Sequence, residues 1–245
     1  MSNTTISASA LAIGDELLSG KTRDRNIGHL AVTLTSIGVT LREVRIVQDD
    51  ESAIVEALND LRSKYDYVFT SGGIGPTHDD ITADSISKAF DLPCIYEDKA
   101  MELLSAHYKQ RGLEFTAARQ RMARMPEGAV HIHNPVSVAP GFHIKNVYVM
   151  AGVPKVFEAM LSNVIPTLKT GTILLSDSII SFHGEGDIGT PLGDIQNDNP
   201  DISIGSYPKF AQDGGYSSEI VVRGLDNEKI AKAILEIKAM LNSLD

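Results

Sequence analysis

Apolar positions along the first 70 residues recur with two alternating spacings. Ile6 to Ile13 and Val39 to Val47 are apolar-rich runs of the length that strands favour. Between them, apolar side chains recur every three or four residues, as on one face of a helix, at Ile27, Leu30, Leu34 and Ile37. A second helical segment around Leu58 leads into a short strand, Tyr67 to Thr70. This βαβαβ order predicts a parallel sheet covered by helices, with ligands bound beyond the carboxyl ends of its strands.

The alternation continues to about residue 170 and then changes. Helices are predicted over 80–90, 98–111, 116–124 and 154–168, and strands over 129–133 and 147–150. Later segments predict strands over 173–182, 202–207 and 216–222, a glycine-rich helix over 184–196, and a last helix capped by Asp226. We therefore expect an α/β domain with a mostly parallel sheet, residues 1–170, and a small α+β domain, residues 171–245.

Composition and charge exclude several classes of protein. Among the 245 residues 42% are apolar, the formal net charge is −10, and no cluster of Lys and Arg is dense enough to follow a nucleic-acid backbone. No apolar stretch reaches the roughly 20 residues of a membrane span. The first ten residues lack the basic and apolar parts of a secretory signal, so we expect a cytoplasmic protein. The single cysteine, Cys94, excludes a disulfide scaffold.

The strongest chemical signal is the segment from Thr70 to Asp80, TSGGIGPTHDD. Its three glycines lie between a strand and a helix, where backbone N–H groups can point at an anion. Asp79 and Asp80 are hard oxygen ligands of the kind that bind Mg²⁺ beside a phosphate. In the alternative interpretation, Thr77 caps the helix and the two aspartates only stabilise its N-terminus. Capping does not explain the glycines, so we favour the functional interpretation.

Further candidates follow the first two strands. The segment Gly14 to Thr22 has five residues between its glycine and the Gly-Lys pair, one more than a P-loop, and it is acidic. Asp15 or Glu16 is instead a candidate metal ligand or a polar wall of the pocket, and Asp24 and Asn26 enter this pocket from the start of the next helix. Asp24 is equally a helix cap. The Asp49-Asp50 pair ends the second strand and belongs either to the same pocket or to the cap of the next helix.

The second half of this domain offers weaker candidates. Asn134 and the Ala139-Pro140-Gly141 turn either line the pocket or form plain loops. Basic side chains that are either phosphate ligands or simply solvated are Arg119, Arg121, Arg124 and Lys155.

Taken as a set, these motifs resemble the N-terminal domain of the CinA (competence/damage-inducible protein) family. They also resemble the MoaB/MogA-like molybdopterin-binding domain that is found in eukaryotic FAD synthetases. The resemblance rests on Gly14-x-Glu16-Leu-Leu-x-Gly20, Asp24-x-Asn26, Gly72-Gly-x-Gly-Pro-Thr77-x-Asp-Asp80-x-Thr82, Ala139-Pro-Gly141 and Ala151-Gly-Val-Pro-Lys155. It implies a three-layer α/β/α sandwich. The substrate-binding residues that it implies are Gly14, Asp24, Asn26, Ser71, Gly72, Gly73, Gly75, Pro76, Thr77, Thr82, Asn134, Pro140, Gly141, Pro154 and Lys155.

The resemblance also implies a reaction. The CinA branch is associated with metal-dependent hydrolysis of ADP-ribose and the FAD synthetase relatives with hydrolysis of FAD, so we expect a nucleotide pyrophosphatase. Asp79 and Asp80 would hold Mg, Mn or Co, while Glu16 or Asp49 orients the attacking water. The alternative is a MoaB/MogA-like protein that binds or adenylylates molybdopterin. A monovalent cation and a homo-oligomer are implied by resemblance alone. Since the sequence ends at Asp245, we expect no amidase domain.

Overall fold

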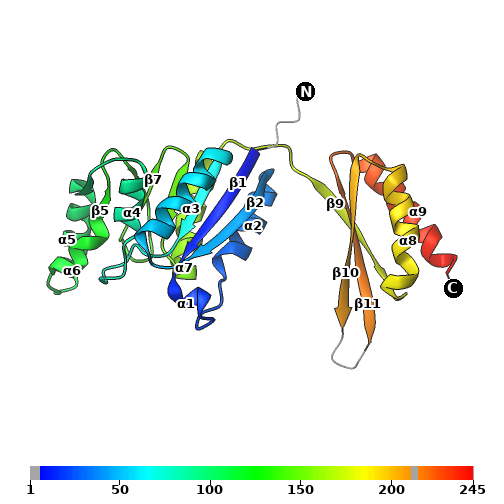
Figure 1. The fold of residues 1–245 in the computed structure, drawn as a ribbon, viewed down its shortest axis with the longest axis horizontal. Coiled ribbons are helices and arrows are strands. Elements are labelled where there is room, and N and C mark those ends of the chain that lie inside the picture. Colours follow the sequence, from blue (N-terminus) through cyan, green and yellow to red (C-terminus); the bar gives the residue numbers. More distant parts are fainter. Residues whose placement is uncertain (1–5, 211–214, 245) are drawn as a thin grey trace. The chain divides into compact units, whose positions relative to one another are not determined.

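The computed structural model of this chain describes residues 6–210 and 215–244. It divides into two compact units, residues 1–171 and 172–245 (Figure 1). No helix within the described ranges is long and apolar enough to cross a membrane.

The N-terminal unit is built on a six-stranded sheet in the order β2-β1-β3-β8-β7-β6. Four neighbouring strands are parallel, and β7 and β6 each run antiparallel to the strand before them in this order. The bounds are β1 Ile6–Ile13, β2 Val39–Val47, β3 Tyr67–Ser71, β6 Val130–Ile132, β7 Gly141–Ile144 and β8 Val147–Met150. Helices α3 and α4 cover one face of the sheet, and α2 and α7 cover the other (Figure 1). This confirms the three-layer α/β architecture with a mostly parallel sheet.

The remaining elements of this unit are helices and a small antiparallel pair of strands. The helices are α1 Asp15–Leu18, α2 Asn26–Ser36, α3 Glu51–Lys64, α4 Thr82–Ala89, α5 Asp98–Gln110, α6 Ala117–Gln120 and α7 Pro154–Val164. The 3₁₀ turns are η1 Arg121–Ala123 and η2 Ile165–Thr167, and the paired strands are β4 Cys94–Tyr96 and β5 Arg124–Pro126.

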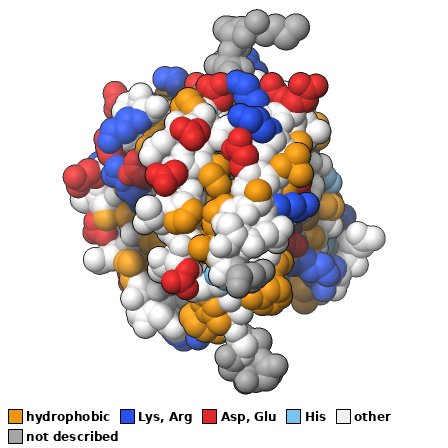
Figure 2. Space-filling model, turned by 90° about the vertical axis from the view of Figure 1, so that its right-hand side faces the viewer, with side chains coloured by type: hydrophobic (Ala, Val, Ile, Leu, Met, Phe, Trp, Pro, Cys, Tyr) orange, Lys and Arg blue, Asp and Glu red, His pale blue; other side chains and the backbone are white. Residues whose placement is uncertain are grey.

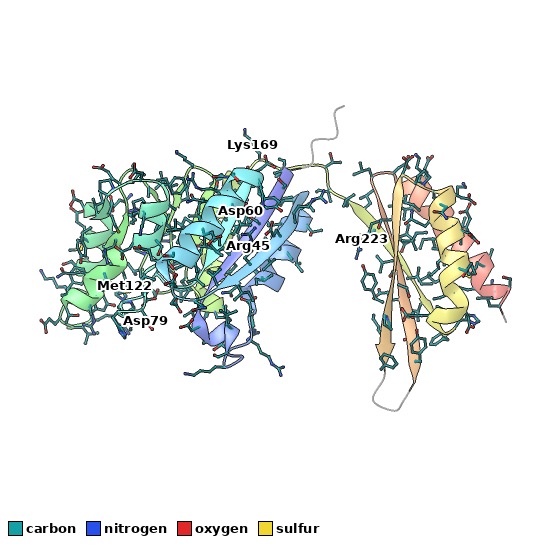
Figure 3. All side chains as sticks on the ribbon, in the orientation of Figure 1. Arg45, Asp60, Asp79, Met122, Lys169 and Arg223 are labelled. Atoms are coloured by element: carbon teal, nitrogen blue, oxygen red, sulfur yellow. The ribbon has the colours of Figure 1, made fainter. Side chains whose placement is uncertain are left out.

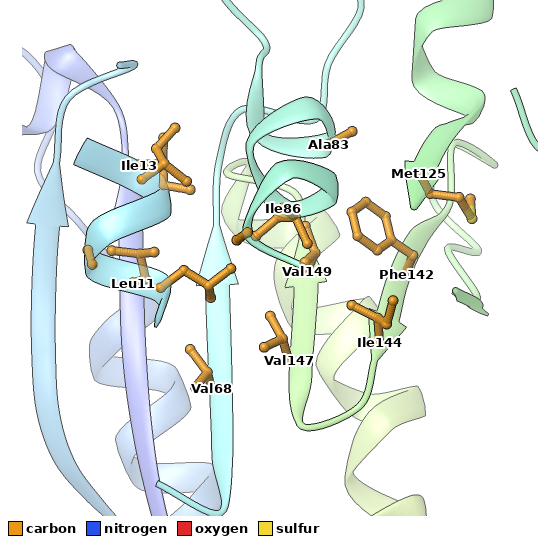
Figure 4. Close-up of a cluster of buried hydrophobic side chains, with 14 of the residues drawn as sticks. Leu11, Ile13, Val68, Ala83, Ile86, Met125, Phe142, Ile144, Val147 and Val149 are labelled. Carbon is orange, nitrogen blue, oxygen red and sulfur yellow. The ribbon is translucent and has the colours of Figure 1, made fainter. Parts of the chain in front are cut away.

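Each face of the large sheet contributes to its own hydrophobic core. On the side of α3 and α4 the core contains Leu11, Ile86 and Val149 (Figure 4). On the side of α2 and α7 it contains Leu30 and Phe157, among other buried residues. Because both faces are covered, the central strands are apolar on both sides, which is why they appear in the sequence as continuous runs rather than alternating ones.

Three expectations for this unit need correction. The predicted helix over 116–124 is two short turns, and Arg124 already belongs to β5, opposite Tyr96. The strands β4, β5 and β7 were not predicted, because three or four residues are too few to show a period. Gly141, expected in a turn, begins β7. A Cβ atom there would lie 2.4 Å from the Val149 carbonyl oxygen, so the close packing of β7 on β8 requires glycine.

The C-terminal unit is a three-stranded antiparallel sheet in the order β10-β11-β9, with α8 and α9 on one face. Its elements are β9 Leu175–Ser181, α8 Glu185–Asp198, β10 Ile202–Phe210, β11 Tyr216–Gly224 and α9 Asn227–Asn242. Ile220 and Val222 of β11 pack against Ile234 and Ile237 of α9 in its core. Asp226 caps α9 by accepting the N–H groups of Glu228 and Lys229, as predicted.

His143 of β7 makes the stability of the N-terminal unit dependent on pH. Its ring stacks on Tyr148 at 5.1 Å between centroids, and burial lowers the pKa of His143 from its ordinary value of 6.5. The unfolded chain therefore binds more protons just below pH 6.5, and the free energy of unfolding falls as the pH drops through that range. We expect His143→Phe, which keeps an aromatic ring, to make this fall shallower in urea unfolding between about pH 5 and 8. An identical pH dependence in the two proteins would contradict this prediction.

Candidate functional site

A cavity of about 530 Å³ lies at the carboxyl ends of the parallel strands of the N-terminal unit. The loops that follow β1, β2, β3 and β8 all contribute to it. In Figure 3, Asp79 and Met122 mark this end of the unit. The lining residues are Ile13, Gly14, Glu16, Thr22, Asp49, Gly72, Gly73, Ile74, Gly75, Asp79, Asp80, Met122, Asn134, Ser137, Ala139, Ala151, Gly152, Val153, Pro154 and Val156.

The glycine turn after β3 is held in a conformation that only glycine accommodates. Gly72 and Gly73 have φ values of +111° and +66°. A Cβ atom on Gly72 would lie 2.2 Å from the carbonyl oxygen of Ile13, and one on Gly73 would lie 2.1 Å from the Thr82 hydroxyl oxygen. Thr82 fixes the turn from α4, since its hydroxyl donates to the Gly72 carbonyl and its N–H to the Gly73 carbonyl, both at 3.0 Å. The turn is therefore packed tightly against β1 and α4.

This turn leaves backbone donors unused. The N–H of Gly72 donates to the Met150 carbonyl at 3.2 Å. Within the part of the chain that the structure describes, no group accepts the N–H groups of the next three residues, Gly73, Ile74 and Gly75. All three residues line the cavity. Successive free amides of this kind form a site for an anion.

Thr77 and Asp80 close the turn instead of capping α4. The Asp80 carboxylate accepts the Thr77 N–H at 2.8 Å and the Thr77 hydroxyl. Helix α4 begins only at Thr82, and Ile81 at its N-cap makes no capping bond through its side chain. The interpretation of Thr77 as a helix cap is therefore wrong, while both aspartates line the cavity.

The two aspartates after β2, Asp49 and Asp50, have different roles. Asp50 caps α3 by accepting the N–H of Ala53 at 2.9 Å. Asp49 lines the cavity and accepts the N–H of Asp15 at 3.0 Å. Partial burial, with the nearby charges of Glu16, Asp15 and Asp79, raises the pKa of Asp49. Among the described residues no Lys or Arg lines this cavity, so its four carboxylates have no cationic side chain to balance them there.

Several residues proposed from the sequence lie outside the lining and support it instead. Asp24 accepts the N–H of Ile27 at 2.8 Å, the bond that a helix cap makes. The buried Asn26 side chain donates to the Ser71 hydroxyl at 2.7 Å and to the Gly152 carbonyl at 2.8 Å, which joins α2, β3 and the loop after β8. The proposed residues that line the cavity are Gly14, Glu16, Asp49, Gly72, Gly73, Gly75, Asp79, Asp80, Asn134 and Pro154. Those outside it are Asp24, Asn26, Ser71, Pro76, Thr77, Thr82, Pro140, Gly141 and Lys155.

The arginines considered as phosphate ligands are used elsewhere. Arg121 donates to the Asp80 backbone carbonyl at 2.9 Å and so supports the turn from outside the cavity. Arg124 pairs with Asp84, and Arg119 donates to the Glu114 carbonyl.

Part of the lining carried no signal in the sequence. Ile74, Met122, Val153 and Val156 form much of its apolar wall, and Met122 arrives from η1. Isolated apolar side chains look the same in a core and in a pocket, so only the tertiary structure identifies them.

Comparisons with known proteins place the chain in a family. Residues 9–170 match the model of the probable molybdopterin binding domain, and residues 174–244 match that of the FAD synthase middle domain. A protein of Archaeoglobus fulgidus is 32% identical over 95% of this chain and 96% of its own length. A protein of Pyrobaculum arsenaticum is 35% identical over 81% of this chain and 78% of its own.

A solved structure supports the same assignment. The crystal structure of the protein CinA from Thermoplasma acidophilum is 32% identical, with a TM-score of 0.62, and the match covers 66% of this chain and 98% of that one. These findings confirm the resemblance that the motifs indicated. The chain therefore belongs to the family of MoaB/MogA-like probable molybdopterin-binding domains, with a CinA-like structure in this part and, after it, a segment that matches the FAD synthase middle domain.

Proposed function

We propose that this protein is a metal-dependent nucleotide pyrophosphatase that hydrolyses the diphosphate bridge of ADP-ribose or of a related dinucleotide such as FAD. One observation carries the proposal: three free backbone N–H groups and four carboxylates line one cavity, in which the described residues include no Lys or Arg. Amides alone can hold a phosphate, but the carboxylates would repel it. The combination suits a phosphate that arrives with a divalent cation.

The donor set fits Mg²⁺, Mn²⁺ or Co²⁺. The described residues contain no group of three or more His, Cys, Asp or Glu side chains gathered as a ready-made metal cage. Mg²⁺ needs no such cage, because one or two carboxylates suffice when phosphate oxygens and water complete its shell. Asp79 and Asp80 would hold the ion. When bound, the ion supplies charge that offsets that of the diphosphate and makes a water molecule more acidic.

The chain's own residues then have separate tasks. The amides of Gly73, Ile74 and Gly75 bind one phosphate and stabilise charge that develops on it. Asp49 and Glu16 are the carboxylates left to orient the attacking water and accept its proton. The apolar wall that includes Met122 and Val153 suits the flat ring of a nucleotide base or flavin.

Removal of the two aspartates tests this function. We expect Asp79→Asn/Asp80→Asn to lower metal-dependent release of AMP by at least about 100-fold, because charge stabilisation at the phosphate is lost. The assay is chromatography of the products from ADP-ribose, FAD and NAD, each with Mg²⁺, Mn²⁺ or Co²⁺.

The matched control is Asp50→Asn, since Asp50 lies outside the cavity lining and Asn caps a helix about as well as Asp. This variant should keep the activity of the wild type. Equal turnover by the wild type and a folded double variant would refute the assigned roles of both aspartates.

The family description favours a second candidate, a molybdopterin-binding or adenylyl-transfer protein of molybdenum cofactor biosynthesis. The same amides would then hold the phosphate of the pterin. Tight pterin binding without hydrolysis of any nucleotide, under each of the three metals, would identify this function and exclude the first.

A further inference from the structure

The C-terminal sheet has two edge strands that differ in how well they are protected. Edge strands attract other strands, and proteins block them with proline or lysine. β10 contains Pro208 and Lys209, and Lys209 also pairs with Glu219 of β11. β9, with the sequence LSDSIIS, contains neither residue type. Among the described residues β9 pairs only with β11, so the backbone groups on its other side are not used by a strand.

A groove lies beside this open edge. A cavity of about 490 Å³ is lined from β9 and the segment after it by Ile179, Ile180, Ser181, Phe182 and His183, and from α9 by Lys238, Leu241 and Asn242. Ile180 and Phe182 are 44% and 79% exposed. Figure 2 shows the face of the protein that is on the right in Figure 1, on which hydrophobic, acidic and basic side chains are interspersed. The Asp177 carboxylate accepts the Ser178 N–H of the same strand at 2.8 Å. An extended segment laid along β9 would cover apolar surface and bind the backbone groups of this edge, including the Ser178 N–H once the carboxylate releases it.

Two charges near this edge have no opposite charge to pair with. In the described ranges, no acidic side chain pairs with Lys238 and no basic side chain pairs with Asp177. Both side chains are exposed.

These two charges also face the same side of the sheet. Asp177 lies opposite Val222 and Ser181 lies opposite Ser218 in the register of β9 with β11. Val222 and Ser218 are both buried, and Val222 belongs to the core beneath the helices. Directly opposite residues share a face, so Asp177 and Ser181 are on the side of α9, the helix that carries Lys238.

We propose that β9 is the site at which a second copy of this chain pairs, strand to antiparallel strand, with the two-fold axis at Ile179. In this register Asp177 of one copy lies opposite Ser181 of the other, on the side where Ser181 and Lys238 line the groove. The Asp177 carboxylate of each copy then meets the Lys238 ammonium of the other. The two contacts are equivalent, as a two-fold interface requires, and the two sheets become continuous.

The backbone bonds supply affinity, whereas the charges select the register. A slip by one residue would place Asp177 of one copy on the face opposite to α9 of the other copy, and centring on Asp177 would place like charges opposite each other. Pairing centred on Ile179 therefore brings together Asp177 and Lys238, neither of which forms an ion pair within the described residues.

Charge reversal tests the pairing in the full chain. We expect Asp177→Lys and Lys238→Asp each to raise the dissociation constant of the pairing by about tenfold or more. At a protein concentration near the dissociation constant of the wild type, each variant should show a lower weight-average molar mass than the wild type, closer to that of the unpaired form, by light scattering and sedimentation velocity. The combined variant restores opposite charges and should recover the mass of the wild type.

The control is Ser203→Lys, which adds a lysine to the other edge strand, β10, at an exposed position. It should leave the mass unchanged. Because the pairing joins two copies, its complete loss would halve the molar mass. Circular dichroism verifies that each surface variant is folded. A mass unaffected by both single reversals, or not recovered in the combined variant, would overturn the proposal.

Discussion

Phe157→Ala is expected to lower the free energy of unfolding of the N-terminal unit by about 3–5 kcal/mol. Phe157 is on α7, only 1% exposed, and packs in the core that includes Leu30, Leu34 and Phe69. The substitution removes a fully buried aromatic ring from the helix. It leaves a cavity that the surrounding strands cannot fill without moving. Urea unfolding at neutral pH measures the loss.

Val32→Ala on α2 is the matched control for this substitution. Val32 is 73% exposed, so its truncation should change the free energy of unfolding by less than about 0.5 kcal/mol. If Phe157→Ala cost no more than Val32→Ala, the packing of α7 against the sheet described above would be incorrect.

Gly72→Ala is expected to damage the site and the fold together. The added methyl group would meet the Ile13 backbone carbonyl at 2.2 Å, and the φ of +111° is itself unfavourable for alanine. We expect a loss of roughly 1–3 kcal/mol in stability from the strained backbone. Displacement of the turn by about 1 Å would lower kcat/KM for the proposed hydrolysis by about 100-fold.

The control for this variant is Gly28→Ala. Gly28 lies within α2, and a Cβ atom there meets no other atom within 4 Å. The variant should keep full activity and gain up to about 1 kcal/mol in stability, because alanine favours the helix more than glycine does. Unchanged activity in Gly72→Ala would show that the glycine turn does not position the reacting groups.

Much of the fold could be predicted because its long elements carry their own periodicity. The apolar run of β1, the spacing of Leu30 and Leu34 in α2, and the Asp226 cap of α9 are local signals, readable without any partner. The elements that were not predicted or were predicted wrongly are short: α1, β4, β5, β7 and the region around Arg124. The conformation of β4 and β5 depends on pairing across about 30 residues of sequence, such as Tyr96 with Arg124.

The site was predictable only in part, for a related reason. The glycines after β3 predict a turn, and the acidic residues near them predict a negatively charged site. Neither pattern indicates which groups each side chain contacts. Asp49 and Asp50 are adjacent and chemically identical, yet one lines the cavity and the other caps α3. Thr77 has the character of a helix cap, yet it binds Asp80 within the turn. The role of each of these side chains is therefore set by its position in the folded structure and not by its residue type.

The amino-acid sequence by itself therefore determined the order of the long strands and helices, the parallel part of the sheet, and the turn at which ligands are expected. These properties arise from local backbone preferences and from the period of the apolar side chains. Both depend only on residues that are close together in the sequence. The tertiary structure alone decided which carboxylates share a cavity, that Asn26 supports its wall from behind, and that β9 has an open edge. Those properties depend on distances between residues far apart in the chain, which exist only after the sheet has assembled.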